Sequence, residues 1–238
     1  MLLFMSVRRV ALVTGGAKRV GAAVARRLSA AGFVIIISYK LSRDAALDVA
    51  ASIGGEAIEA DLAAEGAGRS LAGAVLERHG RCDVLFNNAS LFKPDRDCDN
   101  AVIEHARVNV DAPLALIDAL APALTRARGH VVNMLDVLAE RPMRGYSGYS
   151  ASKAALATIT LAKARQLAPA VTVNGIAPGV VAWPDDLPID QREAYLAKVP
   201  LGRAGTPEDV AALAAFLVTE GTYITGQVIR LDGGRSLV

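Results

Sequence analysis

One stretch near the start of the chain, Val10 to Gly21, indicates how this protein folds. It reads VALVTGGAKRVG, and its first four residues form the continuous apolar run of a strand covered on both faces. Gly15 and Gly21 allow a sharp turn and let an anion approach the helix that follows, whose N-terminus favours negative charge. Many loops need glycine, so the turn alone says little. Its position between an early strand and a helix favours a nucleotide-binding loop over a simple turn.

Short strand-like runs alternate with longer helical runs along the rest of the chain. Strands are predicted at 10–13, 33–37, 56–60, 83–86, 130–134, 171–176 and 227–231, and helices at 20–31, 66–79, 100–128, 149–167 and 207–218. Breaks or kinks are expected at Pro113 and Pro122. The alternation predicts an α/β fold with a doubly wound parallel sheet of about seven strands and helices on both faces.

The chain shows no internal repeat, low-complexity tract or linker, so residues 1–238 are predicted to form one domain. Residues 180–198 are predicted to form its longest irregular loop, and a loop of that length is usually functional. Apolar residues make up 53% and charged residues 21%, which excludes intrinsic disorder. The 26 Lys and Arg against 24 Asp and Glu leave a charge of +2, which predicts no binding to nucleic acid or anionic membranes.

The remaining composition bears on metals, membranes and location. Cys82 and Cys98 have no spacing typical of a disulfide framework or a zinc site, so no metal is predicted. No membrane span is expected, because uninterrupted apolar runs such as 33–37 are far shorter than the ~20 residues required. Residues 1–5 faintly resemble a signal sequence, but the charges follow the apolar patch. We interpret them as a disordered leader or the product of an upstream start codon, and predict a cytoplasmic protein.

The end of the second strand indicates which nucleotide is bound. An NAD site has an acidic residue about 20 residues after the glycine loop, where it holds the ribose 2′-hydroxyl. Here the strand ends in Ser38-Tyr39-Lys40, without a carboxylate. Either Arg19 or Lys40 alone would be typical of a solvated surface. Together with a hydroxyl they suit a 2′-phosphate, which predicts NADP.

Tyr149 and Lys153 stand four residues apart on a predicted helix, so they share one face. A neighbouring cation stabilises a phenolate and is expected to lower the pKa of Tyr149 from its ordinary value near ~10. Such a pair can donate a proton to a substrate that receives a hydride. The spacing is common on helix surfaces, and only its combination with the glycine loop makes it specific.

With these motifs the chain resembles the short-chain dehydrogenase/reductase family over nearly its whole length. The family's landmarks stand here in order: the loop Thr14–Gly21, Asp61-Leu62, Asn87-Asn88-Ala89, Asn109, Tyr149, Lys153, Asn174, Pro178-Gly179, Tyr223-Ile224-Thr225-Gly226 and Leu231-Asp232-Gly233-Gly234. The resemblance implies a three-layer Rossmann fold and a nicotinamide cofactor. It also implies a homotetramer formed through the two long central helices and the C-terminal strand.

The resemblance also implies roles for single residues. Tyr149 would be the general acid, Lys153 would hold the ribose and tune Tyr149, and Asn109 would order a proton-relay water. Asp61 would lie at the adenine, and Pro178-Gly179 against the nicotinamide. The cofactor-binding residues implied are Gly15, Lys18, Arg19, Val20, Gly21, Ser38, Tyr39, Lys40, Asp61, Leu62, Asn88, Ala89, Ser90, Tyr149, Lys153, Pro178, Gly179 and Val180.

Two departures from the common family pattern bear on the substrate. Arg19 replaces the middle glycine of the loop, and Asp136, thirteen residues before Tyr149, stands where most members have serine. Both resemble the pteridine reductase branch and the related dihydromonapterin reductases. So do three further segments: Asn88-Ala89-Ser90-Leu91-Phe92, Gly145-Tyr146-Ser147-Gly148-Tyr149 and Asp185-Asp186-Leu187-Pro188.

This branch implies an NADPH-dependent reductase of a dihydropterin such as dihydromonapterin, dihydrobiopterin or dihydrofolate. Phe92 would stack on the flat substrate, Asp136 would bond to it and relay protons, and the predicted substrate-binding residues are Ser90, Phe92, Asp136, Tyr149 and Trp183. Asp136 as a solvated loop acid or a helix cap, and Phe92 as an ordinary core residue under a loop, stay open. So does a generic carbonyl or alcohol reductase. A non-catalytic NADP-binding regulator is a third reading, which the intact Tyr149, Lys153 and Asn109 argue against.

Overall fold

The computed structural model describes residues 8–183 and 187–238. The predicted leader at residues 1–5 and the pair Asp185-Asp186 of the pteridine reductase pattern lie outside the described residues.

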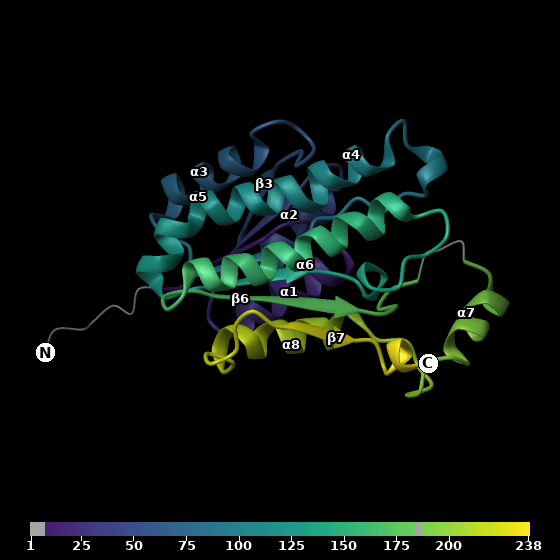
Figure 1. Ribbon diagram of the computed structural model, residues 1–238. Helices are drawn as coiled ribbons and strands as arrows, with labels where there is room; N and C mark the ends of the chain where they lie inside the picture. The colour runs from purple at the N-terminus through teal and green to yellow at the C-terminus, as the bar shows by residue number, and fades with distance from the viewer. Residues whose placement is uncertain (1–7, 184–186) are drawn as a thin grey trace, which may run out of the picture.

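Seven parallel strands form one sheet in the order β3-β2-β1-β4-β5-β6-β7 (Figure 1). They are β1 (Val10–Val13), β2 (Val34–Tyr39), β3 (Glu56–Glu59), β4 (Val84–Asn87), β5 (His130–Met134), β6 (Thr172–Pro178) and β7 (Val228–Leu231). The predicted doubly wound α/β fold, a three-layer Rossmann fold, is confirmed. Each predicted strand lies within two residues of the observed one, because buried parallel strands are read directly from apolar runs.

The helices are α1 (Arg19–Ala30), α2 (Arg43–Ser52), α3 (Ala67–His79), α4 (Ala101–Ala106), α5 (Ala112–Ala127), α6 (Ser147–Leu167), α7 (Ile189–Leu196) and α8 (Pro207–Thr219). Short turns of 3₁₀-helix lie at η1 (Asp95–Asp97), η3 (Val137–Ala139) and η4 (Arg235–Leu237), and a π-helical turn, η2 (Arg107–Asp111), joins α4 to α5. The interruption of the long helix therefore precedes Pro113, and α5 continues through Pro122. This corrects the predicted breaks.

Two helices, α2 and α7, were not predicted from the sequence. α7 lies inside the segment 180–198, which was predicted to be irregular, and it has no buried residue. Helix α2 buries only Ala46, Val49 and Ala50. Neither therefore carries the wide apolar stripe by which an amphipathic helix is recognised.

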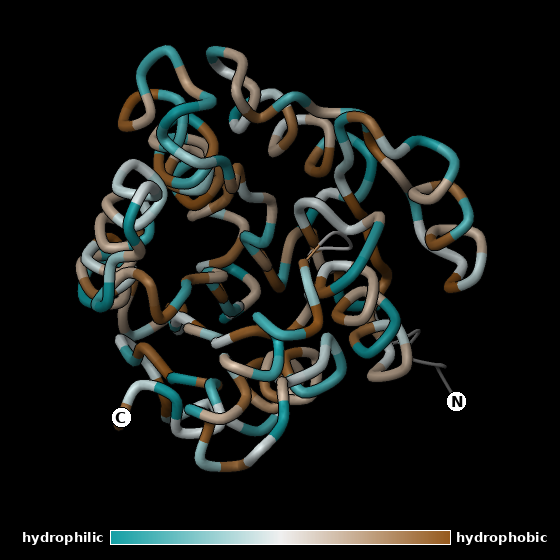
Figure 2. The backbone as a smooth tube through the Cα atoms, turned by 90° about the vertical axis from the view of Figure 1, so that its right-hand side faces the viewer, coloured by the Kyte–Doolittle hydropathy of each residue, from teal (hydrophilic) through white to brown (hydrophobic). Residues whose placement is uncertain are grey.

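Successive residues of each strand face opposite layers of helices. In β1, Ala11 and Val13 belong to the apolar cluster that contains buried residues of α1, α2 and α8. Val10 and Leu12 belong to the second cluster, together with residues of α3, α5 and α6. Viewed from the end to which the strands point, the helices surround the strand ends (Figure 2). Both faces of the central strands are therefore buried under helices.

The continuous helical stretch Ala101–Ala127 is long and apolar enough, at 27 residues, to cross a membrane by length and composition, which corrects the sequence expectation. That expectation counted only uninterrupted apolar runs, and Arg107, Asp111 and Asp118 interrupt this stretch. In its most apolar window 44% of the residues are buried inside the fold, and α5 packs against α3. A core helix of an α/β domain passes the same test of length and composition.

The ends of β1 and β4 are joined by a set of hydrogen bonds that we call the Thr14–Asn88 clasp. The Thr14 hydroxyl accepts from the backbone N–H groups of Asn88 (2.9 Å) and Ala89 (3.0 Å). In return, Nδ2 of Asn88 donates to the carbonyl oxygens of Thr14 (2.9 Å) and Gly15 (3.0 Å). The order in which the chain adds strands reverses between β1 and β4, and in such folds the crevice beyond the strand ends is the ligand site.

Glycine at position 21 is required by this clasp. A Cβ atom there would lie 2.2 Å from the Gly15 carbonyl oxygen and 2.8 Å from Nδ2 of Asn88. We expect Gly21→Ala to lower the free energy of unfolding by roughly 1–3 kcal/mol, as overpacking does. The matched control is Gly73→Ala in α3, where a Cβ meets nothing within 4 Å. That change should stabilise by about 0.5–1 kcal/mol. Urea unfolding checks both, and equal effects would contradict the prediction.

Candidate active site

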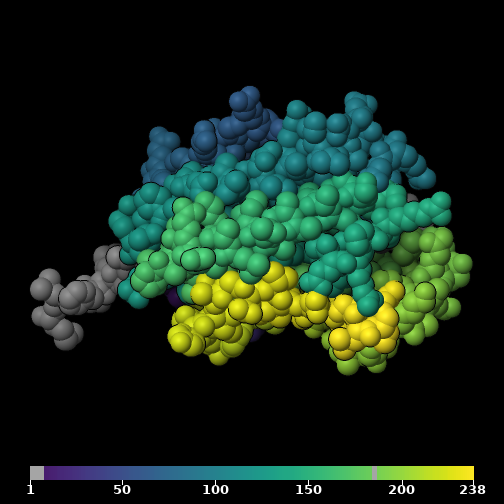
Figure 3. All heavy atoms as spheres, in the orientation of Figure 1, coloured from purple at the N-terminus to yellow at the C-terminus, as the bar shows by residue number. Residues whose placement is uncertain are grey.

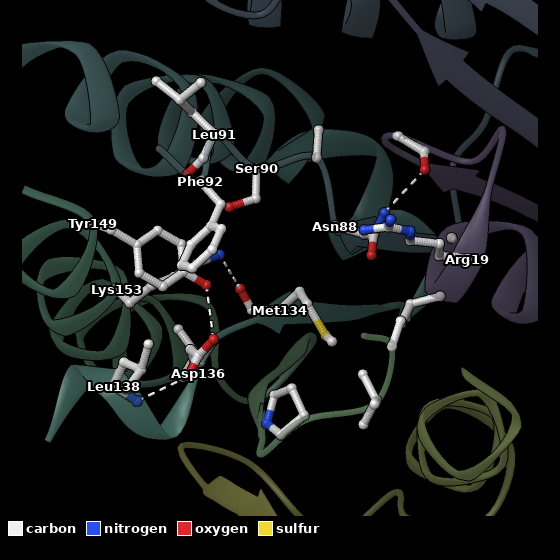
Figure 4. A pocket seen from close by; sticks show the side chains of 18 of the residues that line it. Arg19, Asn88, Ser90, Leu91, Phe92, Met134, Asp136, Leu138, Tyr149 and Lys153 are labelled. Carbon is white, nitrogen blue, oxygen red and sulfur yellow. Dashed lines mark hydrogen bonds between the residues drawn. The ribbon is translucent and has the colours of Figure 1, made fainter. Parts of the chain in front are cut away.

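A cavity of about 1160 Å³ opens at the carboxyl ends of the strands. Every residue predicted to bind cofactor or substrate lines it, from Gly15, Lys40 and Asp61 at one end to Phe92, Asp136 and Trp183 at the other. Among the predicted site residues only Asn109 does not line it. Figure 4 shows Asn88 and Arg19 on one side of this space and Tyr149, Asp136 and Phe92 on the other.

The N-terminus of α1 opens on this cavity without a side-chain cap and without an acidic residue in its first turn. Lys18 and Arg19 are exposed beside it. Uncapped N–H groups with nearby cations make an anion site. Arg19 has a φ of +48°, a left-handed conformation that disfavours residues with a Cβ. This explains physically why glycine is usual at that position.

At the far end of the cavity from Tyr149, Lys40 and Asp61 form an ion pair of 2.9 Å. The hydrogen bond from Lys40 holds the pKa of the Asp61 carboxyl below its usual value. Ser38 is buried, and its hydroxyl lies 3.4 Å from the N–H of Gly15, which donates to it. Lys40, which was predicted to bind the 2′-phosphate, therefore already pairs with the carboxylate of Asp61. The two residues are 21 positions apart in the sequence, and no motif predicted their contact.

Tyr149, Asp136 and Lys153 come together at the inner end of the cavity. The Tyr149 hydroxyl donates to Oδ2 of Asp136 at 2.8 Å, and Oδ1 of Asp136 accepts from the N–H of Leu138 at 2.9 Å (Figure 4). The Lys153 ammonium donates to the Met134 carbonyl at 2.8 Å and lies 5.6 Å from the centre of the Tyr149 ring. Asp136 is thus both the cap of η3 and the partner of the tyrosine.

Burial controls the protonation of these three groups. Burial raises the pKa of Asp136. Burial, followed by the Asp136 charge, raises the pKa of Tyr149 well above 10. Burial lowers the pKa of Lys153 from 10.5 to about 8. Sequence analysis expected Lys153 to lower the pKa of Tyr149. The structure shows the opposite direction, because desolvation and the hydrogen-bonded carboxylate dominate. Tyr149 is therefore a protonated donor at neutral pH.

Asn109 lies in the π-helical turn η2 and is fully buried. Its Nδ2 donates to the Leu91 carbonyl (3.0 Å) and to the Ser152 hydroxyl (2.9 Å). Its Oδ1 accepts from the Leu91 N–H (2.8 Å) and the Ser90 hydroxyl (3.1 Å). The side chain thereby fixes the segment Ser90-Leu91 beside Tyr149. Its predicted role in ordering water stays a prediction.

Two aromatic groups line the substrate end of the cavity. Phe92 stacks on Tyr146 (ring centroids 4.7 Å apart, 17° between planes) and meets Tyr149 edge-on. Phe92 is 48% exposed, so it is not the ordinary core residue of the alternative interpretation. Trp183, which also lines the cavity, packs edge-on against Tyr195 of α7, whose hydroxyl accepts from the Val180 N–H at 3.2 Å.

Several lining residues were missed by sequence analysis. They are Arg141, Met143, Gln191, Tyr195, Arg235 and Ser236. These residues come from the chain before α6, from α7 and from the C-terminal segment. The three segments are far apart in the sequence, so no short motif contains residues from all of them. The one sequence feature that pointed to them was the length of the segment 180–198. That length predicted a functional role for the segment, and Gln191 and Tyr195 of this segment do line the cavity.

The chain matches a family model described as "Enoyl-(Acyl carrier protein) reductase" over residues 15–236. It is also 34% identical to pteridine reductase 1 of Leishmania tarentolae over 278 residues, covering 96% of each chain. The chain belongs to the short-chain dehydrogenase/reductase family. Another member, a 3-oxoacyl-[acyl-carrier-protein] reductase of Synechocystis sp., is 35% identical over 95% of this chain and 96% of its own.

A solved structure has the same arrangement. It is a blue fluorescent protein from a metagenomic library, crystallised in complex with NADPH. The TM-score is 0.88 and the sequences are 32% identical, with 96% of this chain and 98% of the other covered. Family membership, and with it the Rossmann fold inferred from the motifs, is therefore established for this chain.

The burial of Lys153 predicts how the stability of the protein changes with pH. Between about pH 8 and 10.5 the unfolded chain binds a proton at Lys153 that the folded chain has released. The free energy of unfolding therefore rises with pH in this window. Lys153→Met removes the titration. We expect the wild type to gain about 1–3 kcal/mol relative to Lys153→Met as the pH rises through the window. Urea unfolding of both proteins measures this, and parallel pH curves would contradict it.

Proposed function

We propose that this protein is an NADPH-dependent reductase that converts a dihydropterin-type substrate to its tetrahydro form. Dihydromonapterin, dihydrobiopterin and dihydrofolate are the candidate substrates. The observation that carries the proposal is the 2.8 Å hydrogen bond between the hydroxyl of Tyr149 and the carboxyl of Asp136, in a cavity that Phe92 also lines.

The residues of the cavity suit NADPH. The uncapped N-terminus of α1 with Lys18 and Arg19 fits a pyrophosphate, and Gly15 and Gly21 keep side chains out of that approach. Lys40, with Ser38 nearby, can bind a 2′-phosphate through its positive charge. The phosphate would compete for Lys40 with the carboxylate of Asp61. Lys153 and Tyr149 lie at the other end of the same space. NADPH, when bound, supplies a hydride.

The chain itself handles the proton. Reduction of a ring C=N bond takes one hydride and one proton, and Tyr149 is the protonated group at the cavity wall. Its burial and its bond to Asp136 disfavour a free phenolate. For the step, Asp136 must be protonated and the hydrogen bond reversed, so that the carboxyl gives its proton to the Tyr149 oxygen as Tyr149 gives its own to the ring nitrogen, which leaves Asp136 as a carboxylate. Asp136, whose pKa is raised by burial, is suited to carry that proton. Lys153 supplies the positive charge beside the developing phenolate.

The shape and polarity of the cavity favour a planar, nitrogen-rich substrate. A pterin presents ring nitrogens and an exocyclic amine, which a carboxyl group bonds better than a hydroxyl does. Phe92 and Tyr146 together form an aromatic surface against which a flat ring can pack. A ketone would need only a neutral hydroxyl at position 136.

A carbonyl reductase is the second candidate, because the relatives include 3-oxoacyl-[acyl-carrier-protein] reductases such as that of Pseudomonas aeruginosa, 32% identical to this chain. The apolar lining residues Leu138, Met143 and Leu187 are compatible with an acyl group. Assays with dihydropterins, acetoacetyl thioesters and simple ketones separate the two candidates.

The homotetramer and the cytoplasmic location stay predictions. Exposed apolar side chains on the outer faces of α4 (Val102 and Ile103) and α6 (Leu161) support burial in an assembly, as do Leu237 and Val238. Light scattering would measure the mass in solution.

The cofactor preference is tested at Lys40. Losing one charge-assisted phosphate contact costs about 1.5–3 kcal/mol, or roughly ten- to a hundredfold in affinity. Lys40→Gln should weaken binding of NADPH by about the lower figure, since Asp61 already shares the charge. Binding of NADH, which lacks the 2′-phosphate, is the internal control and should be unchanged. Equal affinity of the parent protein for both cofactors would refute the preference.

The substrate class is tested at Asp136. Asp136→Ser installs the residue common in the family and should reduce dihydropterin turnover by about the 10²–10⁴ typical of lost acid–base catalysis. NADPH binding, measured by fluorescence, should be almost unchanged and serves as the control for folding. A variant that reduces dihydropterins as fast as the parent, or a parent that prefers ketones, would favour the carbonyl reductase.

A further inference from the structure

Two arginines from distant parts of the chain meet at the outer part of the same cavity. Arg141 follows η3, five residues after Asp136, and Arg235 begins η4. Both line the cavity that contains Tyr149 and Asp136. In Figure 3 the C-terminal segment, in yellow, lies against α7, in light green, and against teal atoms of the chain that precedes α6.

The two guanidinium groups converge on one oxygen atom. Nη1 of Arg141 donates to the main-chain oxygen of Val238 at 2.5 Å, and Nη1 of Arg235 donates to the same oxygen at 3.1 Å. The arrangement shows that both arginines can bind a single acceptor at once. In the printed chain Val238 is the last residue, so this oxygen belongs to a carboxylate. A carboxylate or phosphate of a ligand presents the same kind of acceptor, and arginine is the side chain best matched to it.

Among the described residues, the Val238 main-chain oxygen is the negatively polarised group that the pair binds, and no acidic side chain joins it. In the described parts of the chain, none of the ion pairs between side chains includes Arg141 or Arg235. Nε of Arg235 is buried and has no hydrogen-bond partner there. The Arg235 guanidinium is held over the Tyr195 ring, 5.6 Å from its centre, so it is positioned rather than free to swing. Buried donors without a partner are uncommon, so this N–H can still donate to an acceptor that enters the cavity.

We propose that Arg141 and Arg235 form a subsite for an anionic group on the far end of the substrate, a carboxylate or a phosphate. The proposal rests on the proposed function, because it places the reacting ring beside Tyr149 and Asp136 and the anionic tail at the arginines. The tail displaces the Val238 oxygen and takes over its two hydrogen bonds to the arginines, while the Val238 oxygen turns to solvent. A substrate that carries such a tail is then preferred over a neutral one with the same ring.

The test compares substrates that share a ring. In steady-state assays with NADPH, kcat/KM is measured for dihydrofolate, which carries carboxylates, and for dihydrobiopterin, which is neutral. Arg141→Gln and Arg235→Gln should each lower the ratio of the two values about tenfold, since each loses a charge-assisted bond. Arg235→Lys, which keeps the charge, should restore part of the ratio.

The matched control is Arg144→Gln, an exposed arginine three residues from Arg141 that does not line the cavity. It makes the same change in net charge and should leave the ratio unchanged. An equal loss in Arg144→Gln would show a general effect of charge and would overturn the proposal. An unchanged ratio in the Arg141→Gln, Arg235→Gln double variant would overturn it as well.

A second measurement keeps the subsite testable if no dihydropterin is reduced. Binding of p-aminobenzoylglutamate and of phenyl phosphate to the NADPH-loaded protein is measured by ligand-observed NMR, with the diamide of the first as the neutral control. We expect the parent to bind at least one anion, and the double variant to bind it about tenfold more weakly. The stronger of the two identifies the tail as carboxylate or phosphate. Equal binding by parent and double variant, or by acid and diamide, would overturn the proposal.

Discussion

The hydrogen bonds between Thr14 and Asn88 are the constraint on which the rest of the site depends. They join the ends of β1 and β4, the two strands between which the sheet reverses its winding, and so fix the floor of the crevice. The clasp needs the Gly15 carbonyl and the Asn88 amide in contact, which leaves no room for a Cβ at Gly21. The same glycine brings the N-terminus of α1 close to the cavity. One packing requirement thus positions both the sheet and the anion site.

Burial determines the chemistry at the other end of the crevice. Tyr149 and Lys153 are buried side chains of α6, and Asp136, two residues after β5, is partly buried beside them. In such surroundings each group shifts toward its neutral form. The hydrogen bond between Tyr149 and Asp136 therefore joins two groups that exchange protons. Tyr149 keeps its proton at neutral pH, and a protonated Asp136 can resupply Tyr149 after it has donated. The cost of burying Lys153 is offset in part by its bond to the Met134 carbonyl.

The same cavity is also lined by the aromatic groups and by Arg141 and Arg235. The Trp183–Tyr195 contact and the placement of Arg235 over Tyr195 make α7 and the C-terminal segment one wall. Gly179 permits this wall to approach, because a Cβ there would come within 3.1 Å of the Tyr195 hydroxyl. Substrate selection is therefore built from segments that lie outside the cofactor motifs.

The sequence by itself determined the strands, the phosphate loop and the Tyr149–Lys153 pair. Each is encoded locally: apolar runs mark buried parallel strands, and a spacing of four residues places two side chains on one helix face. Family resemblance added Asp136 and Phe92, and the structure brings both beside Tyr149. Only the tertiary structure decided that α7 is a helix, that Asp61 shares the charge of Lys40, and that the pKa of Tyr149 rises. The convergence of Arg141 and Arg235 is of the same kind. These features depend on burial and on contacts between residues far apart in the chain, which no periodicity records.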